Sequence, residues 1–201
     1  MEGPFDPTHP SVLFDLEFTA WEGSLASGWS RPGEWREVIQ IGAVRLGPGP
    51  ELAEEASFSC LVRPLRNPLL SDYIIALTGI SQNAVDAHGL AFPDALARFD
   101  AFIGGGDAPV CCNGGDDQVL ADNAAWHGVP TSRHAGRIID IRRHLARLLG
   151  VGDRLFFSTH VAELAGGTAA PGQQHDALAD ARTIAAGLRL LIADGRLAGA
   201  H

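Results

Sequence analysis

The chain has 201 residues, of which 46% are hydrophobic and 19% charged; this composition indicates a folded globular protein and excludes a disordered one. Its length suits one domain with a core of ordinary size. The net charge of −9 argues against nonspecific binding of nucleic acid through a broad basic surface. The basic residues are all arginines, and those between 133 and 154 fit either a solvated helix face or a phosphate track.

The cysteines and the chain ends indicate the compartment and the domain limits. Cys60, Cys111 and Cys112 are odd in number and two are adjacent, so we expect reduced thiols in a cytoplasmic protein without a disulfide framework. Residues 1–10 have neither the basic nor the apolar region of a signal peptide, and no segment approaches the length of a membrane span. We expect a flexible leader over 1–10, one domain over 11–193 and a tail over 194–201.

Three apolar runs, 11–18, 38–46 and 56–63, predict strands that follow one another closely enough for an antiparallel meander. The polar stretch between the first two strands, 19–37, contains three tryptophans. These rings either pack this loop onto the domain or offer a stacking surface for bases.

The second half of the chain alternates helices with short strands. A segment with short helical pieces, 66–89, leads into it. Apolar spacing and Gly or Pro boundaries predict strands over 108–112 and 137–141, and helices over 93–103, 116–127, 141–149, 159–164 and 176–193. Three strands followed by this alternation indicate one mixed α/β sheet with helices on its faces.

Asp15 and Glu17 stand two residues apart in the first predicted strand. Their side chains therefore share one face of it, while Val12, Phe14 and Leu16 take the other. Two neighbouring carboxylates on a buried strand repel each other and lose hydration, and a divalent cation between them relieves both effects. Carboxylates facing water at a strand end are the alternative.

Three further residues break the apolar pattern. Asp180 lies on the apolar stripe of the last predicted helix, Asp116 follows a glycine turn, and His175 precedes the last helix. Carboxylates from separate segments suit cations of the magnesium class, which prefer oxygen ligands. A histidine, with an ordinary pKa of about 6.5, is suited to accept a proton from water.

These residues fall within motifs of a known family. The motifs are Phe14-Asp-Leu-Glu-Phe-Thr19, Ile39-Gln-Ile-Gly-Ala-Val44, Leu77-Thr-Gly-Ile80, Asn113-Gly-Gly-Asp-Asp-Gln-Val-Leu120 and His175-Asp-Ala-Leu-Ala-Asp-Ala181. In this order they resemble the DEDDh 3′→5′ exonucleases, which include ribonuclease T and polymerase proofreading subunits. The tryptophan-bearing segment is most similar to the branch of histone-mRNA and interfering-RNA exonucleases and their bacterial relatives.

The resemblance implies a ribonuclease H-like fold, with a mixed five-stranded sheet and helices on both faces. It implies that two divalent cations, Mg²⁺ or Mn²⁺, are held by Asp15, Glu17, Asp116 and Asp180, with His175 as the general base. It implies substrate contacts at Phe18, Thr19, Leu77 and Thr78. The substrate would be the 3′ end of single-stranded RNA or DNA, and the products nucleoside 5′-monophosphates.

Several alternatives stay open at the level of sequence. Asp117 adjoins Asp116, and helical spacing does not decide which of the two faces the metals. A catalytically silent module that binds nucleic acid or protein would share the fold, and a ribonuclease H-type endonuclease would cut within a strand. The choice between RNA and DNA, and between monomer and homodimer, is likewise open.

Overall fold

A computed structural model describes residues 5–152, 157–168 and 175–197. At its centre is a five-stranded sheet with strand order β3-β2-β1-β4-β5. The first three strands form an antiparallel meander, and β4 and β5 run parallel to β1, so the predicted mixed sheet is confirmed. The strands are β1 (Ser11–Phe18), β2 (Val38–Leu46), β3 (Glu54–Leu61), β4 (Val110–Cys112) and β5 (Ile138–Asp140).

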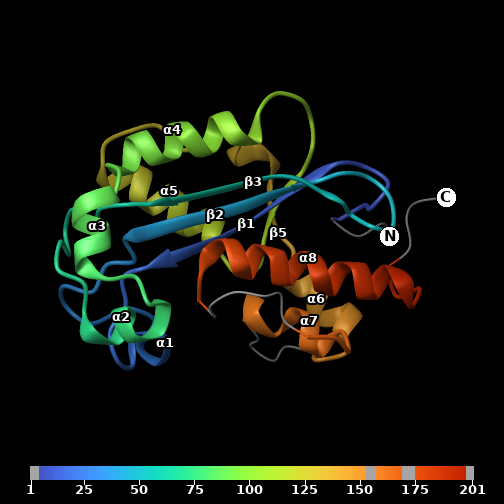
Figure 1. The fold of residues 1–201 in the computed structure, drawn as a ribbon. Coiled ribbons are helices and arrows are strands. Elements are labelled where there is room, and N and C mark those ends of the chain that lie inside the picture. Colours follow the sequence, from blue (N-terminus) through green and yellow to red (C-terminus); the bar gives the residue numbers. More distant parts are fainter. Residues whose placement is uncertain (1–4, 153–156, 169–174, 198–201) are drawn as a thin grey trace.

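Helices cover both faces of this sheet, as expected. Figure 1 shows α4 and α5 on one face and α6, α7 and α8 on the other. The smaller α2 and α3 lie beyond the end of the meander, and each begins at a serine whose hydroxyl accepts a backbone N–H. The α-helices are α1 (Ser24–Ser27), α2 (Asp72–Thr78), α3 (Gln82–His88), α4 (Phe92–Ile103), α5 (Asp116–Trp126), α6 (Arg142–Leu149), α7 (Val161–Leu164) and α8 (Ala177–Ala193).

The alternation of β1 divides its side chains between two apolar cores. Val12, Phe14 and Leu16 belong to the core beneath α4 and α5, where Phe14 meets Phe99 with ring centroids 5.2 Å apart. Leu13 belongs to the core on the α8 side. Asp15 and Glu17 share the face of Leu13, so the strand directs both carboxylates toward the helices that follow β5.

The predicted leader over 1–10 and tail over 194–201 lie partly outside the described residues, and some of their described residues pack against the domain. Phe5 is buried in the core on the α8 side, and the Gly49 amide donates a hydrogen bond to the Pro7 carbonyl. Leu197 is also buried there, and its amide donates to the Leu191 carbonyl. Both apolar side chains lie outside the domain predicted over 11–193 and pack against its core.

Two other expectations concern cysteines and membranes. The structure contains all three cysteines as free residues, and the adjacent Cys111 and Cys112 are buried. Among the residues that the structure describes, no helix is long and apolar enough to cross a membrane. The predicted loop over 166–174 lies partly outside the described residues.

Candidate active site

Four buried acidic residues meet in one cleft. Asp15 and Glu17 come from the end of β1, Asp116 begins α5, and Asp180 lies in the first turn of α8. Each is 5–7% exposed, and with His175 they line a cleft of about 500 Å³. Because β1 and β4 are parallel, their carboxyl ends lie at the same edge of the sheet, and this brings the start of α5 beside Asp15.

The glycine turn after β4 decides between the two adjacent aspartates. Gly114 and Gly115 have φ angles of 126° and 87°, which side-chain-bearing residues rarely adopt. This turn starts α5 with Asp116 buried in the cleft and Asp117 exposed to solvent. The structure therefore places Asp116, and not its neighbour, among the gathered carboxylates.

The start of α8 is fixed to β2 by two residues that the sequence reasoning did not single out. The Gln40 side chain donates to Asp176 at 2.8 Å and accepts from the Ala177 amide at 3.0 Å. A Cβ on Gly42 would lie 2.1 Å from the Leu178 backbone nitrogen, so only glycine allows the helix to approach this closely. Their membership of the Ile39–Val44 motif was the available signal.

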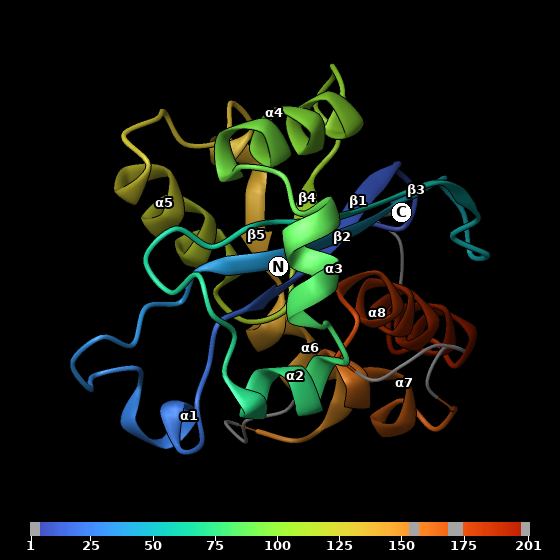
Figure 2. The same cartoon turned by 60° about the vertical axis from the view of Figure 1, so that its left-hand side comes forward.

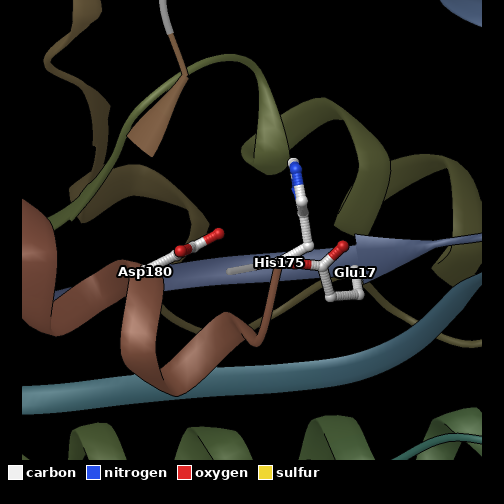
Figure 3. Close-up of side chains that lie close together, drawn as sticks. All are labelled: Glu17, His175 and Asp180. Carbon is white, nitrogen blue, oxygen red and sulfur yellow. The ribbon is translucent and has the colours of Figure 1, made fainter. Parts of the chain in front are cut away.

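Glu17, His175 and Asp180 form a group whose size suits a metal ion. One ligand atom from each lies within 4.8 Å of the others. Figure 3 shows Glu17 on β1 and Asp180 on α8, with His175 on the segment leading into that helix. His175 has a φ of 58°, and this left-handed conformation belongs to the turn just before the helix begins.

Burial and nearby carboxylates raise the pKa of each of these acids. Burial raises the pKa of Asp15 to about 7 and that of Asp180 to about 8. Burial also raises the pKa values of Glu17 and Asp116 well above their ordinary range, and the charge of Asp15 adds to both increases. Oxygen ligands that repel one another in a buried cleft are a donor set that fits a divalent cation.

Three polar residues support this cluster and were missed as site residues. The Ser158 hydroxyl donates to Asp15 at 2.8 Å, and the Asn113 amide donates to Ser158 at 3.3 Å. Arg142 donates to the Asn113 carbonyl at 3.0 Å, and its positive charge opposes the rise in the pKa of Asp15. Arg142 belongs to the arginine-rich stretch, but no sequence pattern marked Ser158 as a partner of a strand 143 residues away.

The residues expected to contact substrate divide into two pairs. Phe18 and Leu77 line the cleft. Thr19 and Thr78 are buried and are not among its lining residues, and their hydroxyls bond within the protein. The Thr19 hydroxyl donates to the Trp35 carbonyl, and that of Thr78 donates to the Ile74 carbonyl at 2.8 Å. The structure thus gives these two hydroxyls a role in holding the loop after β1 and the end of α2.

Residues 12–188 match the sequence profile of the exonuclease family RNase_T. The chain belongs to this exonuclease family. The match begins in β1 and ends in α8, so it spans every element that contributes an acid to the cleft. The resemblance drawn from the motifs is confirmed.

Named relatives of this exonuclease domain match part of it. ERI1 exoribonuclease 2 of Xenopus laevis is 32% identical over 93 residues, which cover 46% of the chain and 12% of that relative. The 3′-5′ exonuclease Snipper of Drosophila melanogaster is 33% identical over 94 residues, covering 46% of the chain and 31% of Snipper. The matched stretches therefore span less than a third of the curated relatives.

Solved structures match over nearly the whole domain. The nuclease domain of 3′hExo, a DEDDh family member, bound to rAMP, has a TM-score of 0.78 and 25% identity, covering 96% of the chain and 97% of that domain. A second structure shows the 3′-end specific recognition of a histone mRNA stem-loop by a 3′-exonuclease. It has a TM-score of 0.79 at 24% identity, and the match covers 98% of this chain and 68% of that one. The ribonuclease H-like fold is therefore confirmed.

Proposed function

We propose that this protein is a 3′→5′ exonuclease that removes nucleotides from single-stranded RNA or DNA and releases nucleoside 5′-monophosphates. The observation that carries the proposal is the convergence of four buried carboxylates from three elements, with His175, in one cleft. Family membership, the named 3′-5′ exonuclease relatives and the likeness to a nuclease domain bound to rAMP support it.

We propose Asp15, Glu17, Asp116 and Asp180 as the ligands of two divalent cations, Mg²⁺ or Mn²⁺. Burial, and then repulsion from neighbouring carboxylates, raises their pKa values, and bound cations would relieve the repulsion. When bound, the cations would polarise the scissile phosphate and stabilise the charge on the leaving 3′ oxygen. The hydrogen bond from the Ser158 hydroxyl holds the Asp15 carboxylate in place.

His175 supplies the general base in this proposal. Burial, and then the nearby His160, lower its pKa, so the imidazole is neutral at neutral pH and able to take a proton from water. It lies next to Glu17 and Asp180, where the attacking water must be held. His175 lies in the turn before α8. The hydrogen bond from Gln40 to Asp176, which fixes the start of this helix, therefore also helps to position His175.

The rest of the cleft suits the terminal nucleotide. Its volume of about 500 Å³ lies within the range of about 300–1,000 Å³ that small-ligand sites occupy. Phe18, Leu77 and Tyr73 give it an apolar side against which a base can pack, and Arg142 gives it a positive charge near the carboxylates. An apolar wall beside an acidic one fits a base on one side and a metal-bound phosphate on the other.

The test uses single-stranded RNA and DNA oligonucleotides labelled at the 5′ end, with Mg²⁺, Mn²⁺ or a chelator. A 3′→5′ exonuclease shortens the labelled strand stepwise and releases mononucleotides, whereas an endonuclease gives fragments of intermediate length from the start. A catalytically silent binding module leaves the strand intact. Asp15→Asn, purified in parallel, controls for a contaminating nuclease, because only a contaminant would retain activity in that preparation.

A further inference from the structure

Trp35 and Trp126 form an aromatic pair outside the cleft. Trp35 precedes β2, Trp126 ends α5, and their rings meet edge to face with centroids 5.2 Å apart. Trp21 and Trp29, by contrast, line the cleft itself, and Trp29 packs against Phe18. Trp35 is 37% exposed, which is unusual for a side chain that gains most from burial.

Arg66 lies against both of these rings. Its guanidinium carbon is 4.3 Å from the centroid of Trp35 and 5.5 Å from that of Trp126. Arg66 is exposed and, among the described residues, forms no ion pair with a carboxylate. The neighbouring Arg36, by comparison, pairs with Asp122 at 3.3 Å. Arg66 therefore keeps its charge available while its flat group is held on an aromatic surface.

The loop carrying Arg66 is fixed from below by a buried carboxylate. Glu37 is 1% exposed and accepts hydrogen bonds from three successive backbone amides, those of Leu65, Arg66 and Asn67, at 2.8, 2.8 and 2.5 Å. The Asn67 side chain also donates to the Gly33 carbonyl at 2.9 Å. The surface of Trp35, Arg66 and Trp126, which we call the Trp-Arg platform, is thus preorganised.

The platform adjoins the cleft. Arg36 follows Trp35 in the chain, lines the cleft, and lies 5.9 Å from the ring centroid of Trp29. The Thr19 hydroxyl joins the end of β1 to the Trp35 carbonyl. Figure 2 shows the loop before β2, the segment after β3 and α5 on the same side of the molecule. A strand leaving the cleft past Arg36 would reach the platform next.

We propose that the Trp-Arg platform binds single-stranded nucleic acid upstream of the nucleotide held in the cleft. A base would stack on the exposed Trp35 and the Arg66 plane, and the free charge of Arg66 would meet the backbone phosphate. This inference rests on the proposed function for its substrate. Two observations favour a polyanionic strand over a protein as the occupant. The platform is continuous with the cleft, and it presents the unpaired charge of Arg66 although the chain as a whole has a net charge of −9.

The test compares Arg66→Gln with Arg63→Gln in binding and in turnover. Arg63 is a matched control because it is also exposed and three residues away, but its side chain donates to the Asp86 carbonyl and not to the platform. Binding of a fluorescein-labelled single-stranded 12-mer is followed by anisotropy in Ca²⁺ without turnover. Because base stacking contributes at least a fivefold change in affinity, Arg66→Gln should raise the Kd about fivefold or more, and Arg63→Gln less than twofold.

Substrate length separates a binding platform from a structural role. Trp35→Leu should weaken binding of the 12-mer as Arg66→Gln does. Trp35→Phe keeps an aromatic ring and should retain most of the affinity. Neither variant should change kcat/KM for a dinucleotide by more than about twofold, because a dinucleotide ends before the platform. Equal Kd values for the two arginine variants, or equal losses on short and long substrates, would overturn the proposal.

The binding measurement also separates this inference from the proposed function. An inactive protein whose 12-mer binding still depends on Arg66 would overturn the exonuclease proposal and uphold the platform. An active exonuclease whose affinity for the 12-mer does not depend on Arg66 or Trp35 would uphold the exonuclease proposal and overturn the platform. A protein partner would then remain as the occupant of this surface.

Discussion

Replacing Asp15 by asparagine should stabilise the metal-free protein at neutral and alkaline pH. The unfolded chain releases this proton near pH 3.8, whereas the folded protein holds it until about pH 7, so raising the pH across this window favours unfolding. At about 1.36 kcal/mol for each pKa unit, the ionised Asp15 costs the folded state about 4 kcal/mol above pH 7. Asparagine carries no charge and can still accept the hydrogen bond from Ser158.

The expected signature is a stability difference that grows with pH. Without metal, wild type and Asp15→Asn should have similar free energies of unfolding at pH 4. At pH 8 the free energy of unfolding of the variant should be higher by up to about 4 kcal/mol. For a domain of this size that corresponds to a rise of roughly 8–16 °C in Tm. Urea unfolding at four pH values between 4 and 8, after treatment with a chelator, measures it.

Addition of Mg²⁺ or Mn²⁺ should reverse this order at pH 8. Wild type should gain stability from the cation, while Asp15→Asn should lose most of that gain together with the nuclease activity. Asp117→Asn is the matched control, since it makes the same chemical change at an exposed neighbour of the cluster and should alter stability by less than about 0.5 kcal/mol. A stability difference independent of pH, or an unchanged response to metal, would refute the reasoning.

Four further changes test other parts of the site. His175→Ala should lower the turnover rate by roughly 10²–10⁴-fold while calorimetry shows little change in metal affinity; a matching loss of affinity would make this histidine a ligand. Ser158→Ala removes a hydrogen bond that lowers the pKa of Asp15, so metal affinity at pH 7 should fall roughly 10-fold or more, and an unchanged affinity would contradict the support we assign to it. Gly42→Ala should destabilise the protein by about 1–3 kcal/mol or more, because its Cβ meets the start of α8; a variant with wild-type Tm and activity would show that the helix moves aside freely. The rise in Tm produced by Mg²⁺ should be larger at pH 8.5 than at pH 6, because cations bind ionised carboxylates and Asp180 has a pKa of about 8; an equal rise at both values would count against this site.

The sequence by itself determined the sheet, most helices and the identity of the gathered acids. Alternating apolar residues and glycine or proline boundaries are local signals, so β1 and β2 were predicted with the limits that the structure shows. Asp15 and Glu17 stood out as neighbouring carboxylates on a buried strand, and Asp180 stood out as a carboxylate on the apolar stripe of a helix. These signals are local and do not depend on where the rest of the chain lies. The motifs that contain these residues then indicated the exonuclease family.

Only the tertiary structure decided what approaches these residues through space. Packing against the cleft buried Asp116 and left Asp117 in solvent, although the two are adjacent in sequence. Three sets of contacts join residues between 31 and 143 positions apart in the sequence. They are the hydrogen bond from Ser158 to Asp15, the hydrogen bond from Gln40 to Asp176 at the start of α8, and the contact of Arg66 with two tryptophans. Such partners leave no periodic pattern along the chain, because the distance that matters to a hydrogen bond or a ring contact is fixed by the packing of whole elements.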